Sequence, residues 1–387
     1  MGEQPERSRG WETPSIVAFT VVSQGVWEVL LTVLQPGFIN GGPAGLIGNF
    51  IFTSVAMHLL ILSLAEMTSM APHAGCQFHW INVFAPRFIR TPLSFLVGLI
   101  TAICQIAATA SGPSLVGTLV QASIMKLWPQ YIPSSRETTL IIIGVTGVIW
   151  AMSVKGARLL PSLQLYMLAL HFSGGLLFLL IFWKHSPKAT VWLTLTSFTN
   201  GGGWSNDIIA WMVGQTSAVY AYSSFDAPMH MVDVTKNPAR TIPKSMLVGH
   251  WVNGVFGAVF IVSFMLVMTD EKAALQDLTG FPHMWVLSQT LSPTWVAIVN
   301  LIPTILILAG TLDSNISTSL QIQAFASSGG LPYSRWIAEK ERQNGVAVHA
   351  ATVTCVATVA LSLLRLISVD AFDASELYCT FSQDSFD

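Results

Sequence analysis

Tyr222-Ser223-Ser224-Phe225-Asp226-Ala227-Pro228 is a polar stretch inside an otherwise apolar run, and it indicates the fold class. It places two hydroxyls, a carboxylic acid and a helix breaker where a bilayer requires unbroken helix. An Asp at bilayer depth costs about 2.5–3.5 kcal/mol even on lenient insertion scales, so it is tolerated where it faces protein or water. Irregular backbone there carries the same restriction, because its freed N–H and C=O groups need polar partners. The stretch therefore predicts a discontinuous membrane helix with a binding site at its break.

A second interruption of the same kind lies near the N-terminus. Ser23, Gln24 and Gly25, followed by Trp27 and Glu28, interrupt the apolar run from residue 16 to residue 36. Interrupted spans at matching places in two halves of a chain are typical of secondary transporters, whose substrates bind near the middle of the membrane. The two interruptions therefore predict one site between two discontinuous helices.

The composition places the chain among membrane proteins. Of its 387 residues, 52% are hydrophobic and 10% are charged, whereas a soluble domain has about 25% charged residues. The net charge of −2 and the lack of a basic run give no reason to expect a nucleic-acid partner. The cysteines form no Cys-x-x-Cys pair, so we expect packing thiols rather than a metal site or a disulfide framework; they are Cys76, Cys104, Cys355 and Cys379. We expect no cofactor.

Nine apolar stretches are long enough to cross about 30 Å of hydrocarbon, which predicts an all-α polytopic membrane protein. They occupy residues 16–36, 43–67, 92–120, 138–154, 160–183, 207–226, 246–268, 294–312 and 346–368. With the N-terminus inside, the inner segments carry twelve Lys and Arg residues and the outer segments carry five. This excess predicts a cytoplasmic N-terminus.

The order of the spans indicates two repeats. We expect a cytoplasmic tail over residues 1–14 and a transmembrane domain over 15–369, with a first repeat at 16–183 and a second at 207–369. Each complete repeat has an odd number of crossings, so consecutive repeats insert with opposite orientation. Only four spans follow residue 207, and residues 370–387 are polar and acidic. We therefore expect an incomplete second repeat and a polar C-terminal tail.

Several short motifs, taken in order, resemble those of a known family. They are Asn40-Gly41-Gly42-Pro43-Ala44, Ala65-Glu66-Met67-Thr68-Ser69-Met70-Ala71-Pro72, Phe225-Asp226-Ala227 with His230-Met231, Lys236-Asn237-Pro238 and Gly329-Gly330-Leu331-Pro332. The chain from about residue 15 to about residue 367 is similar to the fungal amino-acid/choline permeases of the amino acid–polyamine–organocation (APC) superfamily, which include the GABA permeases.

This resemblance implies a fold and an activity. The fold is the LeuT-like five-plus-five inverted repeat with discontinuous helices 1 and 6. The implied activity is that of a proton-coupled permease (a symporter) of the plasma membrane. Its partners are a small amino acid or an amine such as GABA or choline, the coupling proton and the lipid bilayer.

The resemblance also implies substrate contacts at both interruptions and on the third span. The implied residues are Ser23, Gln24, Gly25, Trp27, Gln105, Tyr222, Ser223, Ser224, Phe225 and Asp226. A broken helix offers unpaired N–H groups to a carboxylate, and an acidic side chain suits an ammonium group. Trp27 and Phe225 can hold a quaternary amine through a cation–π contact worth roughly 0.5–2 kcal/mol. Alternatively, the serines bond to the preceding turn, the aromatic rings pack between helices, and Gln105 bonds across helices.

Three residues are candidates for proton coupling. His171 lies deep in the fifth span, where a buried imidazole titrates near physiological pH; an interhelical hydrogen bond is the alternative. Glu66 lies near the inner end of the second span and either gates the path or pairs with Arg87 or Lys244. Glu28 follows the interruption of the first span.

The eighth predicted span ends at two polar residues. Asp313 and Asn315 follow its last apolar residue, and either line the inner exit or belong to a solvated helix end.

The chain also departs from the family pattern. Gly75-Cys76 stands where the family has two glycines. At Ser319-Leu320 and at residues 326–328 the chain lacks two cationic residues and one acidic residue that the family has there. Together with the missing tenth span, these changes leave open a truncated, non-transporting member or a nutrient sensor of the same fold. An enzyme is not expected, because the sequence has no His-x-x-x-His, Gly-x-Ser-x-Gly or Gly-x-x-x-x-Gly-Lys motif.

Overall fold

The computed structural model describes residues 11–185, 188–340, 346–364 and 366. Within these ranges the regular structure is helical, and the one pairing of strand type is an isolated bridge between Trp11 and Thr235. The prediction of an all-α protein is confirmed for this part of the chain. Most of the predicted N-terminal tail, the whole C-terminal tail and the end of the ninth apolar stretch lie outside the described residues.

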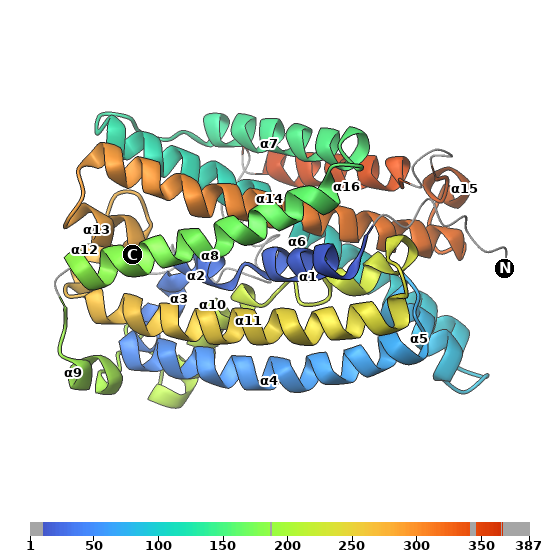
Figure 1. The fold of residues 1–387 in the computed structure, drawn as a ribbon, viewed down its shortest axis with the longest axis horizontal. Helices are drawn as coiled ribbons and strands as arrows, with labels where there is room; N and C mark the ends of the chain where they lie inside the picture. Colours follow the sequence, from blue (N-terminus) through green and yellow to red (C-terminus); the bar gives the residue numbers. More distant parts are fainter. Residues whose placement is uncertain (1–10, 186–187, 341–345, 365, 367–387) are drawn as a thin grey trace.

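The helices follow the apolar stretches of the sequence (Figure 1). The first half contains α1 (Thr13–Gln24), α2 (Val26–Thr32), α3 (Leu34–Ile39), α4 (Gly42–Met70), α5 (Cys76–Phe84), α6 (Arg90–Leu127), α7 (Ser135–Lys155), α8 (Leu160–His185) and α9 (Val191–Thr196). The second half contains α10 (Asp207–Ala221), the 3₁₀ helix η2 (Ala227–Val234), α11 (Pro238–Val267), α12 (Glu271–Leu275), α13 (Pro282–Ser288), α14 (Pro293–Ser327), α15 (Ser334–Ile337) and α16 (Val348–Leu364).

Seven helical segments of the described chain are long and apolar enough to span a membrane. They are Thr13–Thr32, which contains α1 and α2, and then α4, α6, α7, α8 as far as Lys184, α11 and α14. The two other predicted stretches fall on shorter helices, α10 with 15 residues and α16 with 17 residues. The protein is therefore polytopic, and nine crossings stay a prediction.

The prediction that the eighth span ends at residue 312 is wrong. Helix α14 continues to Ser327, so Asp313 and Asn315 lie inside it, 0% and 1% exposed. Gln164 of α8 donates to Oδ1 of Asp313, and Ser153 of α7 donates to Oδ1 of Asn315 at 3.0 Å, while Oδ2 of Asp313 has no hydrogen-bond partner among the described residues. Both side chains thus reach polar groups of neighbouring helices from inside α14, so neither requires the helix to end.

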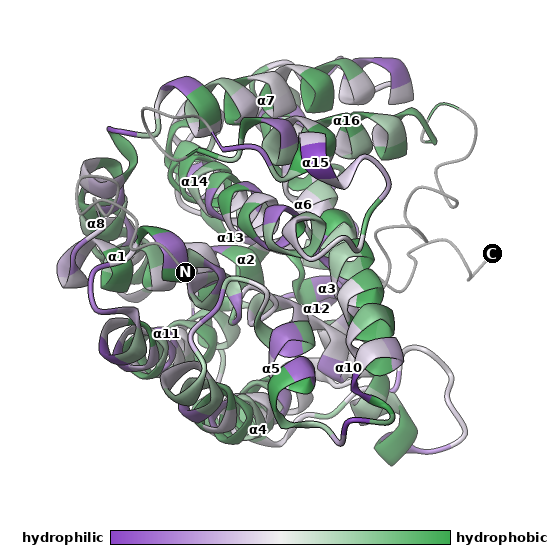
Figure 2. Cartoon of the chain, turned by 90° about the vertical axis from the view of Figure 1, so that its right-hand side faces the viewer, coloured by the Kyte–Doolittle hydropathy of each residue, from purple (hydrophilic) through white to green (hydrophobic). Residues whose placement is uncertain are grey.

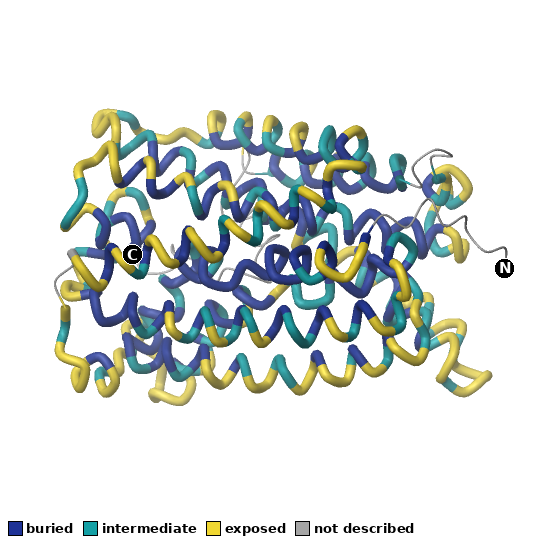
Figure 3. The backbone as a smooth tube through the Cα atoms, in the orientation of Figure 1, coloured by how far each residue is buried: buried dark blue, intermediate teal, exposed yellow. Residues whose placement is uncertain are grey.

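Helices α6 and α14 share the largest set of inter-helix contacts, and α1 packs against α8, α11 and α14. The chain around α1 and α2 is buried, whereas the outer faces of α4 and α8 are exposed (Figure 3). These exposed faces carry large apolar side chains, such as Leu59 of α4 at 64% and Leu176 of α8 at 55%. Figure 2 shows the same apolar character on the outward sides of several helices. A surface of this kind suits contact with lipid.

The two ends of the bundle carry the loops and the ion pairs. Helices α5 and α15 lie at the end marked N in Figure 1, and α9, α12 and α13 lie at the other. At the first end Lys236 pairs with Glu12 at 2.8 Å, and Lys340 pairs with Asp233 at 2.7 Å. At the other end Lys126 of α6 pairs with Asp277 at 2.9 Å. Which end faces the cytoplasm stays a prediction from the Lys and Arg count.

Two stacked histidines lie just beyond the end of α4, outside the membrane helices. The rings of His73 and His79 are 4.0 Å apart between centroids and inclined by 7°. Burial, helped by the neighbouring His79, lowers the pKa of His73 to about 4, against the opposing charge of Asp233. Burial also lowers the pKa of His79. Both rings are therefore held in their neutral form.

This pair predicts acid sensitivity. The pKa of a histidine in an unfolded chain is about 6.5. Above that pH the rings are neutral in both the folded and the unfolded state, so they do not lower the free energy of unfolding. As the pH falls towards 4 the unfolded chain binds protons first, and the folded state loses about 2 kcal/mol at pH 5 through His73 alone. Thermal denaturation of the purified protein should show this loss between pH 7 and pH 5. His73→Gln/His79→Gln should reduce it, and an unchanged acid sensitivity in the double variant would contradict the prediction.

Candidate functional site

The break of the first span is built on one glycine. Gly25 separates α1 from α2 with φ +46° and ψ +46°, a left-handed conformation that costs other residues roughly 1–2 kcal/mol. A Cβ atom at this position would lie 3.3 Å from the carbonyl oxygen of Val22 and 3.4 Å from Cδ of Glu28. The interruption predicted at residues 23–25 is therefore present, and Gly25 gives it its shape.

Asn253 of α11 bridges this break. Its Oδ1 accepts from the backbone N–H of Val26 at 3.3 Å. Its Nδ2 donates to the carbonyl oxygen of Val21 at 3.1 Å and to Oε1 of Gln24 at 3.2 Å. The first of these bonds gives the N–H of Val26 a partner at the break, whereas the carbonyl oxygen of Val21 also accepts from the N–H of Gly25 at 3.0 Å. Asn253 was not among the predicted site residues, although an Asn within an apolar helix is itself a signal of a polar partner opposite it.

Removing this bridge should loosen the break. Asn253→Ala removes the partner of the buried N–H of Val26, at about 1–3 kcal/mol for such a group, so the melting temperature should fall and amide hydrogen exchange at residues 21–28 should accelerate. Asn300→Ala is the matched control. Asn300 of α14 is also fully buried and donates to Leu119 and Ser123, so its loss should destabilise without affecting exchange at the break. Equal exchange at residues 21–28 in both variants would contradict the assignment.

The second break follows the end of α10 at Ala221. The N–H groups of Ser223 and Phe225 donate to carbonyl oxygens three residues earlier, at 3.0 and 3.2 Å. Helix η2 then begins at Ala227, whose carbonyl oxygen accepts from Oγ of Ser317 on α14 at 3.1 Å. The interruption predicted between residues 222 and 228 is therefore present. Its backbone finds protein partners, as the bilayer requires.

Asp226 accepts a hydrogen bond at this second break and lies beside a buried histidine. Nε2 of Gln105 on α6 donates to Oδ2 of Asp226, and Nε2 of His230 lies 3.8 Å from the same oxygen. The Asp226 side chain is 13% exposed and His230 is fully buried. Nδ1 of His230 is 2.7 Å from the carbonyl oxygen of Ala74, to which it can donate. Gln105 thus makes a hydrogen bond to another segment of the protein, which was the alternative to its predicted contact with the substrate.

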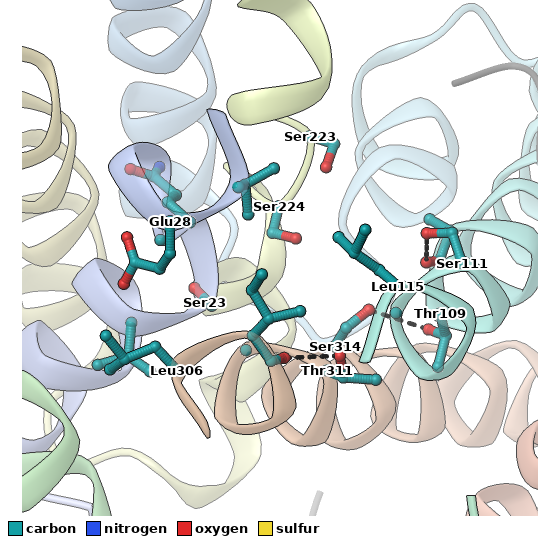
Figure 4. A pocket seen from close by; sticks show the side chains of 18 of the residues that line it. Ser23, Glu28, Thr109, Ser111, Leu115, Ser223, Ser224, Leu306, Thr311 and Ser314 are labelled. Atoms are coloured by element: carbon teal, nitrogen blue, oxygen red, sulfur yellow. Dashed lines mark hydrogen bonds between the residues drawn. The ribbon is translucent and has the colours of Figure 1, made fainter. Parts of the chain in front are cut away.

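A cavity of about 60 Å³ lies between the two breaks (Figure 4). About 10–15 Å³ of such space holds one water, so the cavity has room for several. Its polar lining comes from Ser23, Gln24 and Glu28 around the first break, Tyr220, Ser223 and Ser224 around the second, Thr109 and Ser111 of α6, and Thr311 and Ser314 of α14. Gly25 also lines it, so five of the ten implied contact residues meet here. Among the described lining residues Glu28 is the one carboxylic acid, and none is Lys, Arg or His.

Glu28 forms a buried pair with His171 of α8. Oε1 of Glu28 is 2.7 Å from Nδ1 of His171, and the two side chains are 1% and 0% exposed. Oε2 of Glu28 and Nε2 of His171 have no hydrogen-bond partner among the described residues. The structure therefore joins two of the three candidates for proton coupling at the wall of the cavity.

The three implied aromatic residues lie outside the cavity lining. Trp27 is fully buried and its ring is 4.9 Å from that of Phe260, between centroids. The hydroxyl of Tyr222 is 2.5 Å from Oγ of Ser54 on α4. Phe225 packs against the apolar cluster around Met229. In this conformation their rings pack between helices, and their contact with a substrate stays a prediction, as it does for Gln105 and Asp226.

Glu66 also lies apart from the cavity. It is exposed in the last turns of α4, and the described residues show no ion pair between it and Arg87 or Lys244. Its role in proton coupling stays a prediction.

Comparison with known proteins gives a consistent set of relatives. The profile of the amino acid permease family matches residues 15–385. A Macrophomina phaseolina protein, named as a candidate amino acid/polyamine transporter, is 24% identical over 360 residues, which are 92% of this chain and 78% of that protein. The choline transporter of Saccharomyces cerevisiae is 24% identical over 351 residues, 90% of this chain and 62% of its own. The GABA-specific permease of the same yeast is 22% identical over 386 residues, 97% and 66% of the two chains.

Proposed function

Because the chain belongs to the amino acid permease family, we propose that it is a proton-coupled secondary transporter of amino acids or related amines such as GABA or choline. The observation that carries this proposal is the buried Glu28–His171 pair at the wall of a polar cavity between two helix breaks. Intramembrane ionisable residues facing such a cavity are typical of substrate and proton pathways. The chain spans 62% to 78% of the length of the three relatives described above.

The arrangement of the breaks supports a five-plus-five inverted repeat as the proposed fold. The break between α1 and α2 begins the first half of the chain, and the break between α10 and η2 begins the second. Helices α6 and α14, the third in each half when the broken pair is counted as the first, pack against each other beside the cavity. Alternating access would then be a movement of one half against the other around the cavity. We place this protein in the plasma membrane with its N-terminus in the cytoplasm.

The cavity favours a substrate with an ammonium group. Glu28 supplies its carboxylate, and the hydroxyls of Ser23, Ser224 and Thr311 supply further acceptors. Because the described lining residues include no cationic side chain, an ammonium group meets no repulsion there. A carboxylate on an amino-acid substrate would accept a hydrogen bond from Ser224, because the hydroxyls of Ser23 and Thr311 already donate to the carbonyl oxygens of Thr20 and Ile307.

His171 is the proposed carrier of the coupling proton. Its Nδ1 lies 2.7 Å from Oε1 of Glu28, so a proton on this nitrogen can be donated to the carboxylate in a hydrogen bond. Glu28 then couples proton binding to substrate binding, because its carboxylate contacts the proton carrier and also lines the substrate cavity. This arrangement predicts faster uptake when the external pH is lower.

Uptake measurements test the proposal. Permease-deficient yeast cells expressing the chain would be given labelled amino acids, GABA, choline and a polyamine at external pH 5 and pH 7. We expect uptake of at least one amine-bearing compound, faster at pH 5. Uptake that does not depend on pH would contradict proton coupling. Binding of a compound to the purified protein without any uptake would instead favour the non-transporting sensor.

A further inference from the structure

A second cavity, of about 160 Å³, lies on the far side of α14 from the polar one. Its walls come from α7, α8 and α14 and include Met152, Leu163, Met167, Leu308, Ala309 and Leu312. Every residue that lines it is apolar. Two lining residues at its rim, Val148 and Ile305, are 54% and 42% exposed, so the space is a groove that opens on the apolar outer surface of the bundle.

The chemistry of the groove suits a hydrocarbon chain. Its position on a membrane helix bundle places it in contact with lipid, where water would gain no hydrogen bond from these walls. Methionine side chains are flexible and polarisable, so Met152 and Met167 can adapt to a linear chain. The groove is therefore suited to one acyl chain of a lipid.

Two cations lie where the headgroup of that lipid would be. Lys155 ends α7 one turn beyond Met152, and Arg158 lies in the turn that leads into α8, five residues before Leu163. Both cations are exposed. A rise of about 1.5 Å per residue puts Lys155 within roughly 5 Å of Met152 along the helix axis. The segment from residue 153 to residue 163 carries these two cations and no acidic residue.

We infer that this groove binds one anionic phospholipid, with an acyl chain between α7, α8 and α14 and its phosphate at Lys155 and Arg158. The Lys and Arg count places these cations on the cytoplasmic side, where the leaflet is rich in anionic lipid. The bound lipid has a mechanical role, because α14 separates the groove from the polar cavity. Leu308, Ala309 and Leu312 face the groove, while Thr311 and Ser314 face the cavity. An acyl chain in the groove thus supports the helix that forms one wall of the transport site.

Lipid binding to the purified protein tests this inference without any transport assay. The full chain, stripped of lipid in detergent, would receive phosphatidylserine or phosphatidylcholine, and bound lipid would be counted by native mass spectrometry. Both lipids carry a phosphate, but only phosphatidylserine has a net negative charge. Each cation near such an anionic headgroup contributes on the order of 1 kcal/mol, so with two cations the wild type should retain phosphatidylserine roughly thirtyfold better. Lys155→Gln/Arg158→Gln should remove this preference and keep some binding of both lipids.

A second variant tests the groove itself. Ala309→Leu fills the space and should reduce the binding of both lipids. Gly147→Leu is its matched control, because Gly147 of α7 faces open space away from the groove-lining residues Ile149 and Met152, and a leucine there should leave binding unchanged. Equal retention of the two lipids by the wild type, or an unchanged preference in the charge variant, would overturn the inference. A lipid-independent dimer that Ala309→Leu dissociates would assign the groove to a second copy of the chain and would overturn it as well.

Discussion

Glu28→Gln is expected to abolish proton-dependent uptake while leaving the protein in the membrane. Glutamine can still bond to His171 across the 2.7 Å contact, so the local fold should survive. The lost carboxylate removes a charge-assisted bond worth about 1.5–3 kcal/mol, which corresponds to a roughly tenfold to hundredfold loss of uptake. Labelled-substrate uptake in permease-deficient cells, normalised to surface protein, measures the effect.

A second variant distinguishes an effect on proton coupling from an effect on substrate binding. His171→Gln should remove the difference in uptake between pH 5 and pH 7 and keep some substrate binding, because His171 itself does not line the cavity. Glu271→Gln, in the short helix α12 of a connecting segment, is the control and should behave like the wild type. Normal pH dependence in the Glu28 variant would refute the role given to the Glu28–His171 pair.

Asp226→Asn is expected to have the second large effect. Asparagine can still accept the bond from Gln105, so the second break should keep its shape, but the negative charge beside His230 is lost. Uptake should fall by tenfold or more, since hydrogen bonds to charged groups contribute about 1.5–3 kcal/mol. Surface abundance, followed by antibody labelling, should stay close to that of the wild type.

The chain offers a matched control for this change. Asp233→Asn lies in the same helix η2 and removes a carboxylate that pairs with Lys340 near the end of the bundle. Both side chains of this pair are partly exposed, and exposed pairs contribute about 0.2–1 kcal/mol, so this variant should transport nearly normally. If the Asp226 variant transports as fast as the Asp233 variant, Asp226 has no part in the site.

The two helix breaks could be predicted from the sequence because their signals are local. Gly25 and the run from Tyr222 to Pro228 interrupt apolar stretches, and the structure has breaks at both places. The end of the eighth span could not be predicted in the same way. Asp313 and Asn315 are polar residues at the end of an apolar run, but their partners on α8 and α7 lie about 150 residues earlier in the sequence.

Only part of the site could be predicted from the sequence. Polar residues at the breaks were identified, and several of them line the cavity. The pairing of Glu28 with His171 joins positions 143 residues apart, and that of Asn253 with Val26 joins positions 227 apart. No local pattern encodes such pairs. The orientations of the Trp27 and Tyr222 rings could not be predicted either, because helix packing determines which way each ring points.

The bridges at the two breaks also make each half of the chain depend on the other. Asn253, in the second half, completes the broken helix of the first, and Gln105, in the first half, holds the acid at the break of the second. A half that is synthesised alone would therefore leave polar groups unsatisfied in lipid, at a cost of several kcal/mol for each group. If the chain is cut between α9 and α10 and its two fragments are made separately, each should be degraded, whereas fragments made together in one cell should assemble and rescue one another.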